Sequence, residues 1–328
     1  MSTYKEIKGQ KVQNRSSDPP APFNGQVWYN TTSGALKAKA SVSVQSWATG
    51  NPMNSYRYYL AGGGIQTSAL AFGGRTGPGP ATAVTESYNG TNWTTVNPMN
   101  TARGYLGGCG ASNTNALSFG GKPTTAETEL YNGSNWTTVN PLNTARNRLS
   151  VGGCGTNTAA LAVAGSPGSA SAAVELWNGS NWNSQPSLNN GRQQAATAGI
   201  STSALVAGGE TSSPTSNKTE TWNGSSWTEV GTLNNAKLAM AGAGTSNTSA
   251  IVFGGSVPPS AITETESWNG TSWTEVNDLN TARKSLGGAG TQTSALAFAG
   301  GPSVPTNGNL TEEWSESPVA AVVTITTS

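Results

Sequence analysis

The stretch Tyr88-Asn-Gly-Thr-Asn-Trp93-Thr-Thr-Val-Asn97-Pro-Met-Asn-Thr-Ala-Arg103 decides the fold, because the chain repeats its pattern. Asn-Gly between two strand-like runs is typical of a type I′ hairpin turn, which needs positive φ at both central residues. The aromatic residue therefore ends one strand, and the tryptophan begins the next. This stretch predicts a small antiparallel unit that recurs along the chain.

The tryptophan recurs at spacings of 46, 43, 46, 45 and 46 residues. Its copies are Trp47, Trp93, Trp136, Trp182, Trp227 and Trp273. After each copy come a turn, a basic residue, a Gly/Ala-rich run and an apolar strand such as Ala69-Leu-Ala-Phe-Gly-Gly74. Each unit thus holds four strands in roughly 45 residues, which is the size of one propeller blade.

The basic residue after the turn, the apolar strand ending in Gly-Gly, the Glu-x-aromatic strand and the following tryptophan together resemble the kelch repeat over residues 41–317. The resemblance implies an all-β, six-bladed β-propeller with four strands per blade and glycine-rich inner strands near the axis. The Gly/Ala runs at 61–64, 107–110 and 287–290 fit that crowding, because small side chains allow close approach of backbones.

The two ends of the repeat region are each incomplete. The first copy offers only the strand around Trp47, and the last copy reaches Trp314 without a following Asn-Gly turn. Joined, they complete a sixth blade and remove the open sheet edges of an unfinished ring. In the alternative, the β-prone run Val319–Thr327 closes the blade and the Trp47 strand lies elsewhere. We otherwise assign residues 318–328 to a C-terminal β-prone tail.

Every repeat carries one base and one acid at matching positions. The bases are Arg57, Arg103, Arg146, Arg192, Lys237 and Arg283, and the acids are Glu86, Glu129, Glu175, Glu220, Glu266 and Glu312. We interpret them as structural pairs, because an active site does not need six equal copies. The alternative is that the six carboxylates are presented for catalysis or for binding a cation.

The composition excludes several chemistries. The chain has no histidine and only two cysteines, Cys109 and Cys154, so the commonest general base and a four-ligand zinc site are absent. Galactose oxidase, a kelch-like enzyme, needs histidine for its copper. We expect no cofactor, no metal and no enzymatic activity, with a carboxylate-based, glycan-hydrolysing propeller enzyme as the alternative.

Residues 1–40 do not share the repeat and carry six basic residues against two acidic ones, a net charge of +4. Scattered charges favour a solvated or protein-docked arm over one that binds nucleic acid. Within it, Val27-Trp-Tyr and Ala35-Leu-Lys flank Asn30-Thr-Thr-Ser-Gly34, which predicts a small hairpin. An isolated hairpin is marginal in water, so we expect it to pack on a partner or on the propeller.

The segments Ile7-Lys-Gly-Gln-Lys-Val-Gln, Ser16-Ser-Asp-Pro-Pro and Gly25-Gln-Val-Trp-Tyr-Asn-Thr-Thr-Ser-Gly-Ala-Leu-Lys37 resemble the N-terminal part of tail-fibre-like and other virion structural proteins of marine bacteriophages, notably cyanophages. The resemblance implies a virion component, made in the host cytoplasm, whose residues 1–40 bind other virion proteins within a homo- or hetero-oligomeric assembly. The N-terminus has no signal-peptide pattern, and no apolar run predicts a membrane span.

The connections between strands two and three of each repeat vary most in length and composition, and in a propeller they share a face with the connections between blades. Variable loops on a rigid scaffold commonly carry binding. We expect an anchored arm and a displayed propeller that recognises a host-surface glycan or protein, as a tail-fibre-like or capsid decoration protein. The candidate contact residues are Trp28 and Tyr29 in the arm and Pro80, Thr124, Ser169, Ser213, Pro259 and Thr306 in the loops.

Overall fold

The structure is a computed structural model, and it describes residues 12–77, 79–150, 154–211, 215–301 and 308–325. None of these residues lies in a helix, so the described chain offers no helix that could cross a membrane. The chain divides into two compact units, a larger one of residues 46–315 and a smaller one drawn from residues 1–45 and 316–328.

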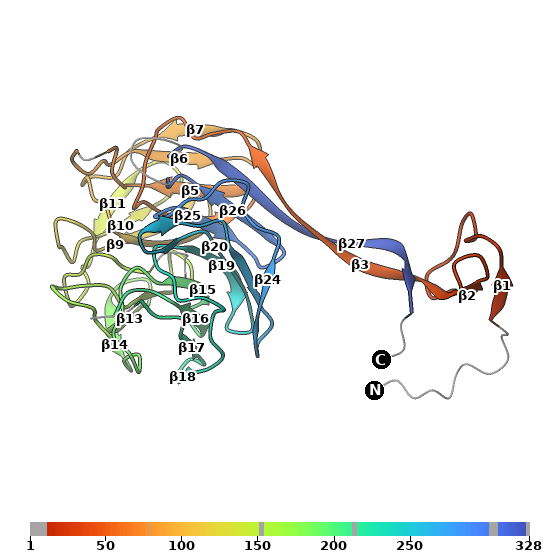
Figure 1. The fold of residues 1–328 in the computed structure, drawn as a ribbon. Helices are drawn as coiled ribbons and strands as arrows, with labels where there is room; N and C mark the ends of the chain where they lie inside the picture. The colour runs from red at the N-terminus through yellow and green to blue at the C-terminus, as the bar shows by residue number, and fades with distance from the viewer. Residues whose placement is uncertain (1–11, 78, 151–153, 212–214, 302–307, 326–328) are drawn as a thin grey trace. The chain divides into compact units, whose positions relative to one another are not determined.

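The larger unit consists of small antiparallel sheets, most of them with four strands (Figure 1). Three sheets contain, in order of pairing, β4 (Ala61–Ile65), β5 (Ser68–Phe72), β6 (Thr85–Tyr88) and β7 (Trp93–Val96); β8 (Gly107–Ser112), β9 (Asn115–Phe119), β10 (Thr128–Tyr131) and β11 (Trp136–Val139); and β15 (Ala196–Ile200), β16 (Ser203–Ala207), β17 (Thr219–Trp222) and β18 (Trp227–Glu229).

The remaining strands of the larger unit form one three-stranded sheet, one four-stranded sheet, one short hairpin and part of a sheet that also includes strands of the smaller unit. They are β12 (Ala160–Val163), β13 (Val174–Trp177) and β14 (Trp182–Gln185); β19 (Ala241–Ser246), β20 (Ser249–Phe253), β23 (Thr265–Trp268) and β24 (Trp273–Val276); the short hairpin of β21 (Ser256–Val257) and β22 (Ser260–Ala261); and β25 (Gly287–Gly290), β26 (Ser294–Phe298), β27 (Thr311–Thr324) and β3 (Ala35–Gly50). The predicted all-β architecture of repeated four-stranded sheets is confirmed.

The Asn-Gly hairpins lie where the sequence predicts them, but their turn type differs. Tyr88 faces Trp93 across the hairpin, so the loop has four residues, Asn89 to Asn92. Of these, Gly90 has positive φ, at 92°, whereas Asn89 does not. The Asn89 side-chain Oδ1 instead accepts hydrogen bonds from the backbone N–H groups of Thr91 and Asn92. The type I′ prediction is therefore wrong, because side-chain-to-backbone bonding shapes the turn.

Tryptophans of the outer strands join neighbouring sheets. Trp136 of β11 packs edge-on against Phe72 of β5, with ring centroids 5.0 Å apart. Its indole Nε1 donates to Thr85 Oγ1 of β6 at 3.1 Å. Four other outer-strand tryptophans make the matching bond, at 2.8–3.2 Å. Apolar packing and one buried hydrogen bond thus recur at successive junctions.

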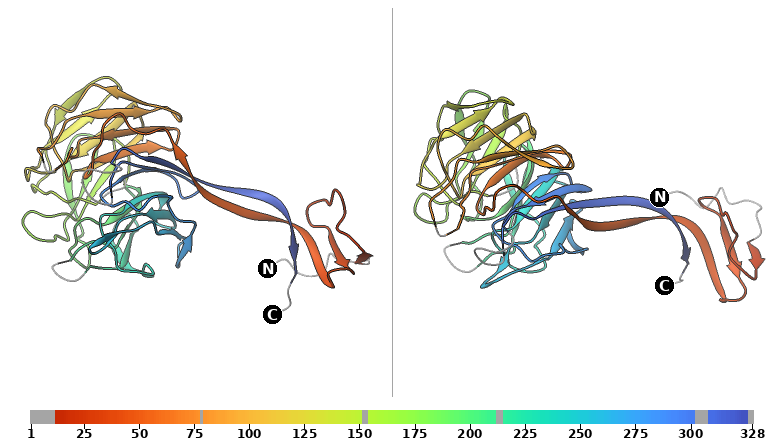
Figure 2. Two further views of the ribbon diagram at one scale, coloured as in Figure 1. Left: turned by 45° about the horizontal axis from the view of Figure 1, so that its top comes forward. Right: turned by 90° about the horizontal axis from the view of Figure 1, so that it is seen from above.

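The inner strands of neighbouring sheets contact one another, which makes the fold β-propeller-like (Figure 2). Strand β4 contacts both β8 and β25, β19 contacts both β15 and β25, and β15 contacts β12. A Cβ atom on Gly63 of β4 would lie 2.4 Å from the backbone nitrogen of Gly110 on β8. Glycine is required there because the two backbones approach too closely for any side chain.

The last repeat pairs with the first. Strand β27 lies between β26 and β3 in one sheet. Within the larger unit, the ring centroids of Trp314 on β27 and Trp47 on β3 are 5.5 Å apart. The alternative, in which Val319–Thr327 supplies the closing strand and the Trp47 strand lies elsewhere, is therefore wrong, because β3 is the strand next to β27. Residues 319–324 continue β27 and group with residues 1–45 rather than forming a separate tail.

The smaller unit contains β1 (Gln13–Arg15), β2 (Val27–Asn30) and the first part of β3. Strand β1 pairs with β2 in parallel, and β2 pairs with residues 35–38 of β3 in the antiparallel hairpin that the sequence predicts. Asp18 joins these elements, because its carboxylate accepts hydrogen bonds from Trp28 Nε1, Asn30 Nδ2 and Lys37 Nζ at 2.8–3.1 Å.

Candidate functional site

The repeated acids and bases form buried ion pairs in the larger unit. The nitrogen–oxygen distances are 2.6–2.9 Å, and the exposed fraction of each side chain is 3% or less. The pairs are Arg57–Glu86, Arg103–Glu129, Arg146–Glu175, Arg192–Glu220, Lys237–Glu266 and Arg283–Glu312. These carboxylates are enclosed rather than presented to a ligand.

The pair of Arg103 and Glu129 illustrates the structural role of these ion pairs. Arg103 Nη1 donates to the backbone oxygens of Gly120 and Glu127, and Nη2 donates to Glu129 Oε1 at 2.8 Å. Glu129 Oε2 accepts the backbone N–H of Asn100. Burial lowers the pKa of Arg103, and the negative charge of Glu129 opposes that shift. The pair therefore fastens the turn before β8 to strand β10.

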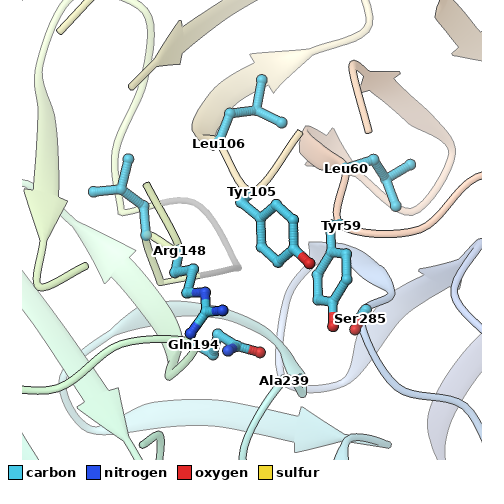
Figure 3. A pocket seen from close by; sticks show the side chains of 9 residues that line it. Tyr59, Leu60, Tyr105, Leu106, Arg148, Gln194, Ala239 and Ser285 are labelled. Carbon is cyan, nitrogen blue, oxygen red and sulfur yellow. The ribbon is translucent and has the colours of Figure 1, made fainter. Parts of the chain in front are cut away.

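A hollow lies where segments preceding the inner strands converge (Figure 3). Its volume is about 20 Å³, enough for about one water molecule. Its lining residues are Tyr59, Leu60, Tyr105, Leu106, Arg148, Leu149, Gln194, Ala239 and Ser285. No carboxylate is among these nine residues. A ligand here would insert one small group and lie mainly across the opening.

Six of the lining residues occupy one repeat position, two residues after the buried base. They are Tyr59, Tyr105, Arg148, Gln194, Ala239 and Ser285, and all have φ between 50° and 59°. For a residue other than glycine, this left-handed conformation costs about 1–2 kcal/mol. Four of the six positions nevertheless carry a large polar side chain where glycine would be least strained, which marks this hollow as a candidate functional site.

Backbone hydrogen bonds in series hold these positions. Tyr59 N–H donates to the oxygen of Ser285, and Tyr105 N–H donates to the oxygen of Tyr59, at 2.9 and 2.8 Å. Gln194, Ala239 and Ser285 donate in the same way to the preceding member of the set, at 2.7–3.0 Å. The unusual φ angles thus follow from bonding between sheets, and the side chains are held in fixed directions.

Aromatic and cationic groups gather on one side of the hollow. The rings of Tyr59 and Tyr105 stack at 3.8 Å with 21° between their planes. The Arg148 guanidinium carbon lies 5.7 Å from the centroid of the Tyr105 ring, and Lys122 Nζ lies 6.0 Å from it. Burial raises the pKa of Tyr105, so its phenol keeps its proton at neutral pH. This side of the hollow is rich in hydrogen-bond donors.

The variable loops begin beside the hollow. Isolated bridges pair Tyr58 with Arg75, Gly104 with Lys122 and Gln193 with Glu210, and the second member of each pair starts a connection between strands two and three. The predicted contact residues Pro80, Thr124, Ser169 and Pro259 are exposed in such connections, whereas Ser213 and Thr306 lie outside the described residues.

The hollow itself was not among the sites predicted from the sequence. The available signal was the position two residues after the repeat's base, which is occupied in turn by Tyr, Tyr, Arg, Gln, Ala and Ser, although the base before it and an apolar residue after it are kept.

In the smaller unit, the two predicted contact residues differ in accessibility. Trp28 is fully buried, and its indole donates to Asp18. Tyr29, the next residue of β2, has its side chain on the opposite face of the strand and is 37% exposed. Hydrogen bonds from Asn30, Trp28 and Lys37 lower the pKa of Asp18. Trp28 therefore belongs to the interior of this unit, and Tyr29 remains as the accessible aromatic of the pair.

Both cysteines are free and buried. Burial raises the pKa of Cys109 and raises that of Cys154 to about 12, so both are protonated at neutral pH. Among the described residues, no group of three or more cysteine, aspartate or glutamate side chains is placed to hold a metal ion.

Comparison with known protein families finds no family that matches this chain. No curated protein matches it either.

Proposed function

We propose that the chain is a non-enzymatic bacteriophage virion protein, tail-fibre-like or capsid-decorating, whose smaller unit attaches to the particle. Residues 46–315 are then a closed, six-bladed propeller displayed for recognition of the host surface. The virion assignment rests on the resemblance of segments within residues 7–37 to phage structural proteins.

Bonds between the first and last repeats support closure. The N–H of Tyr59 donates to the oxygen of Ser285, and Trp93 Nε1 donates to Thr311 Oγ1 at 2.9 Å. Gln66 Nε2 donates to the backbone oxygens of Ala295 and Trp314. These contacts repeat those between consecutive sheets, as expected when the ends of the repeat region meet in a ring.

The main support for the attachment role is the distribution of exposed apolar side chains between the two units. Among the residues that the structure describes, eleven large hydrophobic side chains are exposed, and eight of them belong to the smaller unit: Val12, Phe23, Val27, Tyr29, Val44, Val319, Val322 and Ile325. Phe23 is 66% exposed. Exposed apolar groups concentrated in a small unit indicate a contact surface, because water disfavours leaving them uncovered.

Binding accounts for the larger unit better than hydrolysis does. A glycosidase needs two accessible carboxyl groups on either side of the scissile bond. The repeated glutamates are buried in ion pairs, and the lining of the hollow contains no carboxylate. We therefore propose recognition without bond cleavage.

The attachment role is tested with full-length variants incorporated during phage assembly. Replacing two exposed apolar residues of the smaller unit, Phe23→Ser with Val322→Ser, is expected to reduce the copy number per particle. The matched control, Ile65→Ser with Val257→Ser, changes two exposed residues of the larger unit and should leave it unchanged. Quantitative mass spectrometry of purified particles gives the copy number. Undiminished incorporation of the first variant would reject the attachment role.

A further inference from the structure

We propose that the hollow and its basic rim bind an anionic polysaccharide, with one carboxylate or sulfate group seated against Arg148. The rim is defined as Arg75, Lys122, Arg148 and Lys284. This proposal rests on the display role above and names the class of ligand that the displayed unit recognises.

The lining of the hollow supplies several hydrogen-bond donors for an anion, and it contains no carboxylate that would repel one. Arg148 supplies a guanidinium, Gln194 an amide, and Tyr59, Tyr105 and Ser285 hydroxyl groups (Figure 3). The nearest counter-charge to Arg148 is Glu210, whose Oε2 lies 3.8 Å from Nη1, and both side chains are 40% exposed. An exposed pair at that distance is weak, so an incoming anion can compete for Arg148.

The rim charges come from different sheets, which favours a ligand with repeated negative charge. Arg75 follows β5, Lys122 follows β9, and Lys284 precedes β25. Bridges place each of them on a segment that pairs beside the hollow: Arg75 with Tyr58, Lys122 with Gly104, and Lys284 with Gly301. A polymer that carries a charge on successive units can meet several of these cations at once, whereas a single carboxylate meets one.

The size of the hollow limits what enters it. At about 20 Å³ it has room for about one oxygen atom of a ligand, far less than the hundreds of Å³ typical of a pocket that encloses a small molecule. A carboxylate or sulfate carried directly on a sugar ring fits this limit, because the ring itself stays outside. The tyrosine rings and the rim then contact the sugar across the opening.

The backbone around the hollow argues against an acidic peptide as the main ligand. Peptides that add to a sheet need unpaired N–H and C=O groups. Here Tyr58 and Arg75 exchange both backbone hydrogen bonds, at 3.1 and 2.9 Å. The N–H groups of Tyr59 and Tyr105 are also bonded to neighbouring sheets. Recognition must therefore use side chains, which suits a ligand with many hydroxyl groups of its own.

The test measures binding of the full-length protein to four probes: alginate (a polyuronate), dextran sulfate, neutral dextran and poly-glutamate. We expect binding to alginate or dextran sulfate that weakens as salt rises, and no binding to neutral dextran. Arg148→Gln should weaken binding about tenfold or more. Lys122→Gln, at an exposed side chain, should weaken it about threefold with no effect on folding. Arg15→Gln, the same change in the smaller unit, is the matched control.

Three results would overturn the proposal: no binding to either anionic polysaccharide, binding of poly-glutamate in preference to them, or equal losses from Arg148→Gln and Arg15→Gln. The last would mean attraction by net charge alone. None of these results would contradict the display role. Incorporation of the Arg148→Gln protein into particles is measured separately, and we expect it to be unchanged.

Discussion

Replacing Val174 by threonine should stabilise the larger unit, because one junction between sheets lacks a hydrogen bond that five others have. Trp227 Nε1 is buried without a partner. The threonine that accepts this bond elsewhere is replaced here by Val174, which packs in the same apolar cluster as Trp227. Threonine has nearly the shape of valine, so Val174→Thr would supply the missing acceptor.

The expected gain follows from opposing effects. A buried donor without a partner costs about 1–3 kcal/mol. The hydroxyl replaces a buried methyl group, which loses about 0.8 kcal/mol. The net gain in the free energy of unfolding is therefore about 1 kcal/mol. For a unit of this size it corresponds to a rise in melting temperature of about 2 °C.

Equilibrium urea denaturation, followed by tryptophan fluorescence, measures the change. The matched reverse variant is Thr219→Val, which removes the acceptor from Trp273 Nε1, now bonded at 2.8 Å. It should lose about 1–3 kcal/mol. If Val174→Thr is no more stable than the natural chain while Thr219→Val loses nothing, the bond between tryptophan and threonine does not stabilise the junction.

Three further predictions concern buried polar groups. Glu129→Gln leaves the Arg103 guanidinium buried without its counter-charge and should lower the free energy of unfolding by about 3–5 kcal/mol in urea; a loss under about 1 kcal/mol would contradict the pairing. Lys237→Arg should gain about 1 kcal/mol in the same assay, because a guanidinium can donate to two backbone oxygens while keeping Glu266, as in the other repeats; equal or lower stability would count against this geometry. Burial raises the pKa of Cys154 from 9.0 to about 12, so the folded state keeps a proton that the unfolded state loses. Stability from this thiol is complete below about pH 9 and is lost as the pH rises to about 12. A thiol reagent at pH 8 should react only after denaturation, and rapid reaction of the folded protein would disprove the burial.

The repeated sheets could be predicted from the sequence because their signals are local. Asn-Gly turns, the tryptophan that begins an outer strand, and the apolar run before Gly-Gly each act within a few residues. The Gly/Ala runs also predicted inner strands whose backbones approach closely, as those of Gly63 and Gly110 do.

The hollow could not be predicted in this way, because its geometry depends on bonding between sheets. Nothing near Tyr105 in the sequence indicates a left-handed φ of 55°; the hydrogen bond to the oxygen of Tyr59, 46 residues earlier, accompanies it. Trp28 was likewise assigned to a contact surface, whereas its indole turns inward to Asp18. In both cases the decisive partner lies on another segment of the chain, so periodicity alone does not reveal which side chains are left accessible.

A density map of the assembled phage particle, at a resolution that shows side chains, would reveal directly which unit of the protein is attached and which is displayed. We expect that Phe23, Tyr29 and Val322 are covered by other virion proteins, while Tyr59, Tyr105 and Arg148 face the solvent. A particle in which the hollow is covered and the apolar residues of the smaller unit remain exposed would contradict it.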